Sequence, residues 1–592
     1  MYYIMCSKYG TMVSSIHRMP GGGEEVSVHW KRVVVMGVIL AGIMFFRGWM
    51  SLSVKSATYD EWGHLGNGIR FLHPEDSRFP MDLAHMINPP FARILAAFPI
   101  DITDWQIREM RDIPRPRCRA EKKYFERLTS FPFQFDFSSV DLLKKGRLPG
   151  LLFSLLGIPL LIMLGAELGD IRKGIYGAFL YSFSPNMLAH ARLMTPDASV
   201  SVLFIAVILV WIRMLRSQSA MMAAGGGVLL GIALATKYSA GLMVPVLSMA
   251  WLLCTPRTRL RGFGNTVVAG IIAAVTLLGI YSISVVPVLD HISLDSERGE
   301  EVIRYSAYLE SALGRFLIMP AVVYRYGALI AGNAVMKSYL LGRFSFDGWL
   351  SYFPVAVAIK TPLSLLLLVS CAVGWHLRQS GFRPVKPIYL VVMIPLFYIA
   401  VTLLLGIQVG LRHILPVYPF LCLIAGSLIA EWARRRDMLR MIAWVFMIIL
   451  GIESILIHPH YLAFFNIGTG NPSNGSRYLV DCNLDWGQDL PALARYQKEH
   501  DIPEIRLSYF GTDDPSRYGI NYSFLCRMPG HREPPPGLYA MSATYRQGLY
   551  HFPGNLEDTS WFRSTDPDHI VAYTIMIYDL RDHVQKEPEK NG

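Results

Sequence analysis

The sequence DASVSVLFIAVILVWIRMLR at residues 197–216 has one carboxylate at its first position and no further charge until Arg213. A helix needs about 20 predominantly apolar residues to cross a bilayer. The stretch therefore predicts a transmembrane helix. Because basic residues favour the cytoplasmic side of a membrane, Arg213 and Arg216 place the end of this helix inside and Asp197 outside.

Apolar runs of similar length recur along the 592 residues. They predict ten further spans, at 33–49, 147–167, 174–191, 222–236, 239–254, 264–288, 350–376, 388–407, 414–432 and 439–458. Charged residues make up only 17% of the chain, against about 25% in ordinary soluble proteins. This composition excludes a cytosolic multidomain enzyme, a disordered protein and a disulfide scaffold, and it predicts a polytopic α-helical membrane protein with about eleven spans.

The distribution of basic residues supports this topology and its direction. Five short inner loops contain 14 lysines and arginines, whereas three short outer loops contain only Arg192, Lys237 and Arg412. In a soluble protein, the net charge of +11 would suggest nucleic acid as a partner. Here the cytoplasmic loops account for the excess, and we predict no nucleic-acid partner.

The chain then divides into three parts. Residues 1–32 form a cytoplasmic leader, and residues 33–465 form the transmembrane domain, with large outer loops at 50–146 and 289–349. Residues 466–592 form a small extracytoplasmic α/β domain. Within it, the pattern predicts a helix at 488–499 and strands at 477–481, 505–510, 537–543 and 570–578. Cys482 and Cys526 lie in this polar tail, where a disulfide between them is one possibility.

Carboxylates lie at the predicted outer membrane surface. Asp60, Glu61 and His64 follow the first span by about ten residues, and Asp197 opens another span at the same depth. Asp60 and Asp197 could each simply cap a helix. A carboxylate at the membrane edge is nevertheless costly without a partner, and Arg192 or a metal ion could supply one for Asp197.

Several cations lie on the predicted outer side, although basic residues generally favour the cytoplasmic side. Lys237 lies between two predicted spans, and Arg412 with His413 lies between two others, while Lys360 lies inside an apolar run. A phosphate or carboxylate at the outer face would hold such cations in place. The alternative is that their side chains only reach toward lipid headgroups.

Outward carboxylates and outward cations together suit one chemistry. A lipid-phosphate-linked sugar would bind with its phosphate on the cations, and a carboxylate would take the proton from an acceptor hydroxyl as it attacks the anomeric carbon. Displacement in one step would invert that carbon. Two alternatives remain open, a transporter or flippase and a non-catalytic subunit that binds a lipid-linked sugar. A transporter should show repeated halves and charges near mid-membrane, and neither is apparent.

Five segments resemble a known group of membrane enzymes: Tyr59–Glu61 with His64 and Gly66, Asn88–Pro90, Ala191–Asp197, Thr236–Lys237 and Leu411–Pro416. The chain resembles the polyprenyl-phosphate-sugar-dependent glycosyltransferases of the C-type membrane fold, specifically glycosyltransferase family 39, the protein O-mannosyltransferase-like proteins. The lipid A aminoarabinose transferases are more distant relatives. The resemblance covers about residues 35–465 and implies a hexosyltransferase in a bacterial plasma membrane, with its active site outside.

The resemblance also implies roles for individual residues. Asp60 would be the catalytic base, Glu61 its partner and Asp197 the second acidic residue of the site. The carrier phosphate would contact Lys237 and Arg412. Relatives often carry a lysine before the Pro-Pro pair, where this chain has Asn88. Relatives differ in their use of a divalent metal ion, so no cofactor is assigned beyond that possibility.

The substrates expected from these features are a polyprenyl-phosphate sugar donor, with membrane lipid around it, and a protein, lipid or glycan acceptor. The residues predicted to bind them are His64, Asn88, Arg192, Lys237, Lys360, Arg412 and His413. In the tail, the segment 481–489 resembles one found in some bacterial members. Its Asp485 and Trp486 could hold a sugar, although a helix start with a packed tryptophan is the preferred interpretation.

Overall fold

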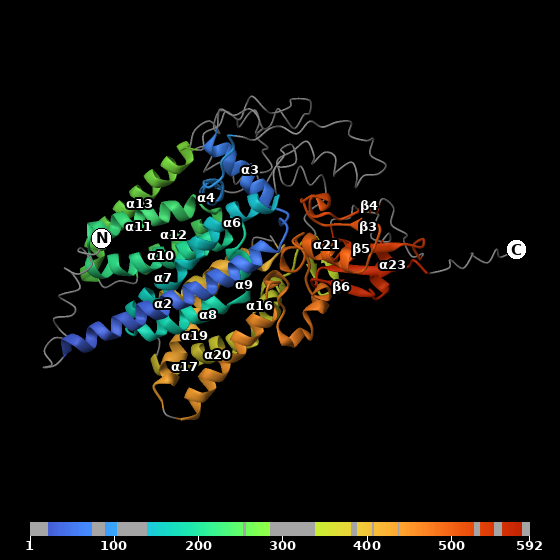
Figure 1. Ribbon diagram of the computed structural model, residues 1–592. Coiled ribbons are helices and arrows are strands. Elements are labelled where there is room, and N and C mark those ends of the chain that lie inside the picture. Colours follow the sequence, from blue (N-terminus) through green and yellow to red (C-terminus); the bar gives the residue numbers. More distant parts are fainter. Residues whose placement is uncertain are drawn as a thin grey trace.

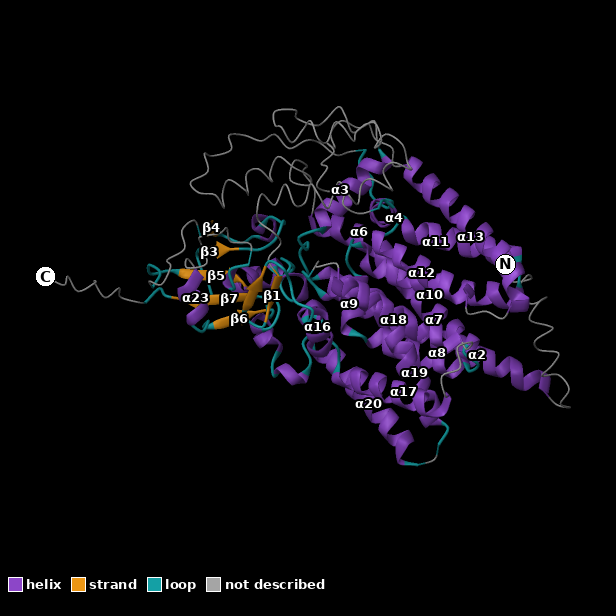
Figure 2. Ribbon diagram, turned by 180° about the vertical axis from the view of Figure 1, so that it is seen from behind, coloured by secondary structure: helices purple, strands orange, loops and turns teal. Residues whose placement is uncertain are grey.

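The computed structural model describes residues 22–73, 89–103, 139–252, 256–283, 338–380, 387–404, 408–435, 437–525, 533–549 and 559–582. Helices run side by side through one body, and the strands gather at one end of it (Figures 1 and 2). Within these ranges, six helical segments are long and apolar enough to cross a membrane. A bent helix pair would make a seventh. The predicted polytopic helical membrane protein is therefore confirmed, whereas the count of eleven spans stays a prediction.

The six long segments are built from the following helices. They are α2 (Gly22–Ser53), α6 (Ser139–Leu155) continued by α7 (Gly157–Glu167), α10 (Pro196–Ser217), α13 (Pro256–Ile283), η4 (Leu411–Val417) continued by α19 (Tyr418–Ala433), and α20 (Met438–Leu456). The buried fraction differs strongly among them: 83% of the apolar window of α10 is buried, but only 17% of that of α13. The window formed by η4 and α19 is 89% buried, so α10, the helix quoted first above, and α19 together lie at the centre of the helical body.

Shorter helices complete the body. They are α8 (Ile171–Phe183), α9 (Pro185–Ala191), α11 (Ala220–Leu234), η2 (Tyr238–Leu242) with α12 (Met243–Leu252), α16 (Tyr352–Lys360), α17 (Leu363–Ser380) and α18 (Pro387–Leu404). Two spans predicted as continuous helices are interrupted. The span at 174–191 breaks at Ser184, and the span at 350–376 bends by 115° between α16 and α17. Both breaks precede a proline, which disfavours the helical conformation of the residue before it.

Glycines allow several of these helices to pack closely. A Cβ atom on Gly426 of α19 would lie 2.4 Å from the backbone nitrogen of Gly177 on α8. Similarly, a Cβ atom on Gly227 of α11 would lie 2.5 Å from the carbonyl oxygen of Ala269 on α13. Small residues at such crossings are typical of membrane helices, where backbone proximity replaces the hydrophobic effect as the source of packing.

The tail contains a five-stranded sheet with the order β4-β3-β5-β7-β6. Its strands are β3 (Ile505–Ser508), β4 (Tyr522–Phe524), β5 (Leu538–Ser542), β6 (His569–Val571) and β7 (Ile575–Asp579). The strands β4, β3 and β5 are parallel, and β5, β7 and β6 are antiparallel. The helix α21 (Leu490–Glu499) begins two residues later than predicted.

Two strand predictions in the tail are wrong. Residues 477–481 form no strand. Arg477 ends the 3-10 helix η7 (Pro472–Arg477) and Tyr478 keeps a helical conformation, while Asp481, with a φ of 59°, begins a further 3-10 turn; these conformations differ from that of a strand. The predicted strand at 570–578 is a hairpin, because Ala572 and Tyr573 have φ values of 53° and 69° and reverse the chain between β6 and β7. Positive φ at both central residues is the requirement of this tight turn.

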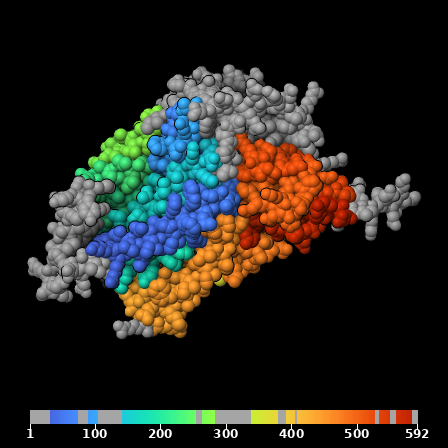
Figure 3. All heavy atoms as spheres, viewed as in Figure 1, coloured from blue at the N-terminus to red at the C-terminus, as the bar shows by residue number. Residues whose placement is uncertain are grey.

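The tail packs directly against the helical body (Figure 3). Trp486 and Phe510 of the tail belong to the same buried apolar cluster as residues of α10 and α19. A small hairpin, β1 (Ser338–Leu340) and β2 (Arg343–Ser345), also joins the tail, since the Leu341 amide donates to the Tyr478 carbonyl at 2.9 Å. At the same end, α3 (Glu61–Leu72) packs against α4 (Phe91–Ala97).

Candidate functional site

Asp60 is the most exposed carboxylate of the candidate site. It precedes α3 as its N-cap, but its side chain makes no capping hydrogen bond. Instead, its Oδ2 atom lies 2.9 Å from the Nη1 atom of Arg412, on η4. The Asp60 side chain is 32% exposed, whereas that of Arg412 is 15% exposed. The Asp60 carboxylate therefore forms an ion pair and does not cap the helix.

Asp197 lies deeper and faces two cations. Its Oδ1 atom accepts a hydrogen bond from Lys237 Nζ at 2.5 Å, and its Oδ2 atom lies 3.8 Å from Arg412 Nη1. Only 2% of the side chain is exposed. Asp197 also lies in the first turn of α10, where the helix dipole favours a negative charge. Arg412 thus connects two carboxylates that are 137 residues apart in the sequence.

The tail closes one side of this cluster. The guanidinium carbon of Arg412 lies 4.4 Å from the ring centroid of Trp486, a cation–π geometry. The Asn483 side chain accepts a hydrogen bond from the Leu411 amide at 2.9 Å. Lys360 donates to the carbonyl oxygens of Leu462 and Asn483. Lys360 therefore joins α16 to the tail, and it forms no ion pair with a described carboxylate.

Glu61 points away from Asp60 into a buried ion pair. Both of its oxygens accept hydrogen bonds from Arg147, at 2.8 and 2.6 Å, and neither side chain is exposed. The Thr58 amide and hydroxyl and the Met194 amide also donate to it, at 2.8, 3.0 and 3.2 Å. Burial alone would raise the pKa of Glu61, but Arg147 and the amides lower it below its usual value. Glu61 is therefore a buried anion that joins α3, α6 and the loop before α10.

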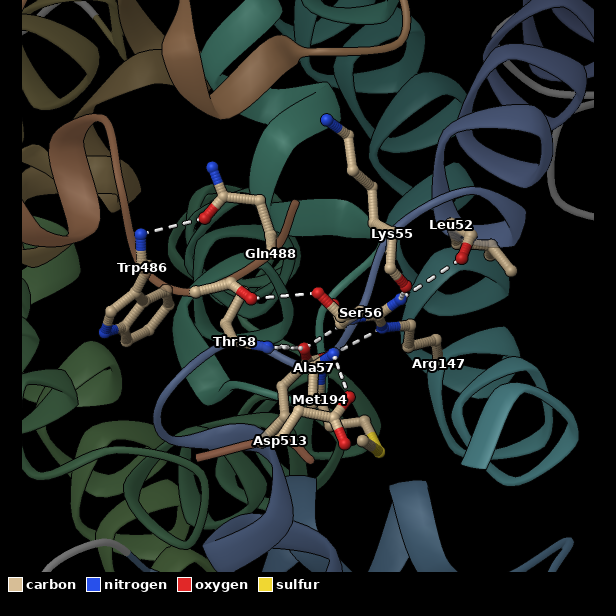
Figure 4. Close-up of polar contacts among 12 residues, drawn as sticks. Leu52, Lys55, Ser56, Ala57, Thr58, Arg147, Met194, Trp486, Gln488 and Asp513 are labelled. Carbon is tan, nitrogen blue, oxygen red and sulfur yellow. Dashed lines mark hydrogen bonds and ion pairs between the residues drawn. The ribbon is translucent and has the colours of Figure 1, made fainter. Parts of the chain in front are cut away.

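The same arginine fixes the segment that carries Asp60. Arg147 donates to the carbonyl oxygens of residues 52, 55 and 56 (Figure 4). The Ser56 amide donates to the Gln488 carbonyl at 3.0 Å, and the Tyr59 amide donates to the Trp486 carbonyl at 2.9 Å. Asp60 is thus positioned from both sides, by a membrane helix and by the tail.

The other predicted binding residues lie at different positions. His64 accepts a hydrogen bond from Arg93 at 3.2 Å and lies in the α3–α4 contact. His413 follows Arg412 on η4, next to the cluster. Arg192 does not partner Asp197. Its side chain is fully buried, and its three nitrogens have no hydrogen-bond partner among the described residues. Asn88 lies outside the described residues.

Two features of the site were not predicted from the sequence. Arg147 was included only as the first residue of a span, although a charge at that depth is itself a signal. A second buried ion pair joins Lys55 to Asp489, with His460 Nδ1 at 2.6 Å from Lys55 Nζ. Burial lowers the pKa of Lys55 to about 8, against the opposing effect of Asp489. No sequence pattern connects Lys55 to residues more than 400 positions away.

Asp485 makes the stability of the tail depend on pH. Burial raises the pKa of its carboxyl to about 7, although the amides of Thr544 and Gly487 donate to it. The folded chain then holds a proton that the unfolded chain releases above about pH 4. The free energy of unfolding is therefore expected to fall by a few kcal/mol as pH rises from about 4 to about 7, at about 1.4 kcal/mol per pKa unit.

Thermal unfolding of the purified protein at pH 5 and pH 8, followed by tryptophan fluorescence, measures this effect. Asp485→Asn should reduce the difference in melting temperature between the two pH values. The matched variant Asp501→Asn, at an exposed position of the same domain, should leave it unchanged. An unaltered pH difference in Asp485→Asn would contradict the assignment.

The described residues do not fit a metal centre. Within the ranges that the structure describes, no three His, Cys, Asp or Glu side chains gather as ligands. Asp197 and Asp60 both face cations at the distances given above, so a divalent ion would have to displace these ion pairs. No step proposed below uses a metal ion. Of the two tail cysteines, Cys482 is a free buried thiol, and Cys526 lies outside the described residues.

Comparison with solved structures finds low sequence identity. The oligosaccharyltransferase AglB from Archaeoglobus fulgidus, in complex with an inhibitory peptide and a dolichol-phosphate, is 12% identical, with a TM-score of 0.44 over 87% of this chain and 70% of that one. ArnT from Cupriavidus metallidurans, bound to undecaprenyl phosphate, is 12% identical, with a TM-score of 0.42 over 92% and 97%. The Saccharomyces cerevisiae protein O-mannosyltransferase Pmt1-Pmt2 complex is 16% identical, with a TM-score of 0.31 over 45% and 34%.

No curated protein matches the chain. Residues 140–283, which include Arg147, Arg192, Asp197 and Lys237, match a family model described as dolichyl-phosphate-mannose-protein mannosyltransferase. This match confirms the resemblance to the protein O-mannosyltransferase-like glycosyltransferases that the sequence motifs predicted, and with it the predicted enzyme class, a glycosyltransferase.

Proposed function

We propose that this protein transfers a sugar from a polyprenyl-phosphate-linked donor to an acceptor hydroxyl, with inversion, at the outer face of the membrane. One observation carries the proposal: Asp60 and Asp197 converge on Arg412 at the end of the helical body where the tail docks. The donor type rests on the description of the matched family. The outer side, and with it an extracytoplasmic tail at 466–592, rests on the asymmetry of the basic loops.

The two carboxylates have different roles in this mechanism. Asp60 is the more exposed and accepts the proton of the acceptor hydroxyl, while the hydroxyl oxygen bonds to the anomeric carbon. The bond from that carbon to the phosphate oxygen breaks, and the carrier phosphate leaves with its negative charge. Asp197 is buried between Lys237 and Arg412. Its role is to hold these cations where the leaving phosphate develops charge.

The mechanism makes Arg412 central to the leaving group. Arg412→Gln should lower the rate of transfer by about 10²–10³, the loss that follows removal of one group stabilising developing charge. The test supplies a radiolabelled polyprenyl-phosphate sugar to the purified protein and measures label in the acceptor. Arg434→Gln is the matched control, because Arg434 is an exposed arginine at the opposite end of α19. Equal losses in both variants would contradict the role of Arg412.

The stereochemistry tests the one-step displacement directly. The product of the native protein should carry the anomeric configuration opposite to that of the donor, as measured by NMR of the isolated product. A retained configuration would exclude Asp60 as the base of a single displacement. Donor binding without transfer to any acceptor would favour the non-catalytic subunit instead.

A further inference from the structure

A polar cavity of about 550 Å³ lies in the tail. Three separate parts of the chain line it: the β1–β2 hairpin with Tyr339, the turn η7 (Pro472–Arg477), and a third part made of Arg546 and Gln547 at the end of α22 (Ala543–Arg546) together with residues between 560 and 576. Its volume falls within the range of small-molecule sites. None of the residues discussed so far as catalytic lines this cavity.

The cavity is strongly basic. Arg477, Arg546 and Arg563 line it, and Asp566 is its one carboxylate among the described lining residues. Arg477 and Arg563 are exposed, and none of the three arginines forms an ion pair with a described carboxylate. Like charges that line one cavity repel each other unless an anion offsets them. The arrangement is therefore suited to an anionic ligand.

The cavity also has a fixed wall. Arg546 is only 9% exposed and is held by Tyr578 Oη at 2.7 Å and by the carbonyl oxygens of Phe562 and Thr565. The Tyr339 hydroxyl donates to the Ser476 carbonyl at 2.8 Å, which fixes the hairpin on the opposite turn. Arg546 and Tyr339 therefore form a preorganised wall, which loses little freedom when a ligand binds.

Neutral groups line the cavity beside the arginines. Asn474 and Gln547 provide amides, and serines provide hydroxyls, among them Ser473, Ser476 and Ser564. With Ser560 the lining contains four serine hydroxyls in all. Amides and hydroxyls donate and accept hydrogen bonds, as the hydroxyl groups of a sugar require. A simple inorganic anion would need neither these groups nor a cavity of this volume. The lining thus combines recognition of negative charge with recognition of hydroxyl groups.

Direct contacts connect the cavity to the candidate active site. Arg546 and Thr544 belong to the same short helix, α22. The Thr544 amide donates to Asp485 at 2.9 Å, and the Thr544 hydroxyl donates to the Asp485 carbonyl at 2.9 Å. The next residue, Trp486, contacts Arg412. A ligand in the cavity would therefore be held by the same part of the tail that closes the catalytic cluster.

We propose that this cavity binds an acidic saccharide unit, bearing a carboxylate or a phosphate, of the glycan that accepts the sugar. That the ligand belongs to the acceptor rests on the proposed function. That the ligand is an acidic saccharide rests on the cavity alone. Arg477 and Arg563 pair with the acidic group, and the amides and hydroxyls bind the sugar ring. It narrows the acceptor from protein, lipid or glycan to an anionic glycan.

Binding of defined oligosaccharides to the full-length purified protein tests the proposal without any donor. Trigalacturonate, a galactose trisaccharide-6-phosphate and the uncharged galactose trisaccharide are titrated by calorimetry. At least one of the two acidic probes should bind at least about tenfold more tightly than the uncharged trisaccharide. A tenfold change in affinity corresponds to about 1.4 kcal/mol, and a hydrogen bond to a charged group contributes at least that much. Preference for the first identifies a carboxylate and preference for the second a phosphate. Equal binding of all three would overturn the proposal.

Variants locate the binding. Arg477→Gln/Arg563→Gln should weaken binding of the preferred acidic probe at least about tenfold, whereas Arg495→Gln/Lys498→Gln removes the same charge from exposed positions of α21 and should not. Asp566→Asn should tighten binding about two- to threefold, because it removes the repelling carboxylate; a merely structural role of these residues predicts no such gain. Equal weakening by both double variants, or displacement by inorganic phosphate at the same concentration as the saccharide, would overturn the assignment.

The outcome is separable from that of the proposed function. Selective binding without any sugar transfer would contradict the transferase mechanism and leave the ligand class intact. Sugar transfer by a protein that does not distinguish acidic from neutral saccharides would overturn the cavity assignment alone.

Discussion

Asp60→Asn is expected to reduce sugar transfer by about 10²–10⁴, the contribution of a positioned general base. The amide cannot accept the proton of the acceptor hydroxyl, but it has nearly the same size as the carboxylate. The Asp60 side chain makes no capping hydrogen bond to α3, and its ion pair with Arg412 is partly exposed. Arg412 keeps Asp197 as a second carboxylate 3.8 Å away, so the variant should fold. Initial rates with a radiolabelled donor, at saturating donor and acceptor, measure the effect.

Asp101→Asn provides the matched control, because Asp101 is an exposed carboxylate of the same connection between α2 and α6 that bonds only to Thr103 among the described residues. It should transfer sugar at the native rate. Donor binding, measured separately, should change less than the rate in Asp60→Asn. If Asp60→Asn kept the native rate, Asp60 would lose its role as the base, and Asp197 would become the next carboxylate to test.

Glu61→Gln is expected to reduce the stability of the fold strongly, whereas Asp60→Asn is expected to reduce the rate of transfer. The substitution leaves the Arg147 guanidinium buried without its counter-charge, and breaking a buried pair in this way costs about 3–5 kcal/mol. The same arginine holds the segment before Asp60, so the damage extends to the junction between α2 and α3. A lower melting temperature and a smaller yield of monodisperse protein in detergent would measure the loss.

The pair can be tested by removing both charges. Glu61→Gln/Arg147→Met should recover part of the stability lost in Glu61→Gln, because the uncompensated charge is gone. The carbonyl oxygens of Leu52, Lys55 and Ser56 would still lack their donor, so recovery should be incomplete. If Glu61→Gln melted at the native temperature and only its transfer rate fell, Glu61 would be a catalytic partner of Asp60, as its place in the sequence motif suggests.

The general architecture could be predicted from the sequence because its signals are local. Apolar length and basic flanks indicate a membrane helix wherever they occur, and the predicted polytopic membrane protein is confirmed. Local patterns were less reliable where one residue decides the backbone. Asp481 and the Ala572–Tyr573 turn interrupt predicted strands through positive φ angles, and Pro185 and Pro362 interrupt predicted spans.

The sequence by itself determined that Asp60, Asp197, Lys237 and Arg412 are charged residues at the ends of apolar segments, where an unpartnered charge is costly. Only the tertiary structure decided which charge faces which. It gives Asp197 to Lys237 and Arg412, leaves Asp60 partly exposed, and buries Glu61 against Arg147. The reason is that an ion pair depends on distances of a few ångströms. Helix packing and tail docking set those distances between residues up to 434 positions apart, as for Lys55 and Asp489.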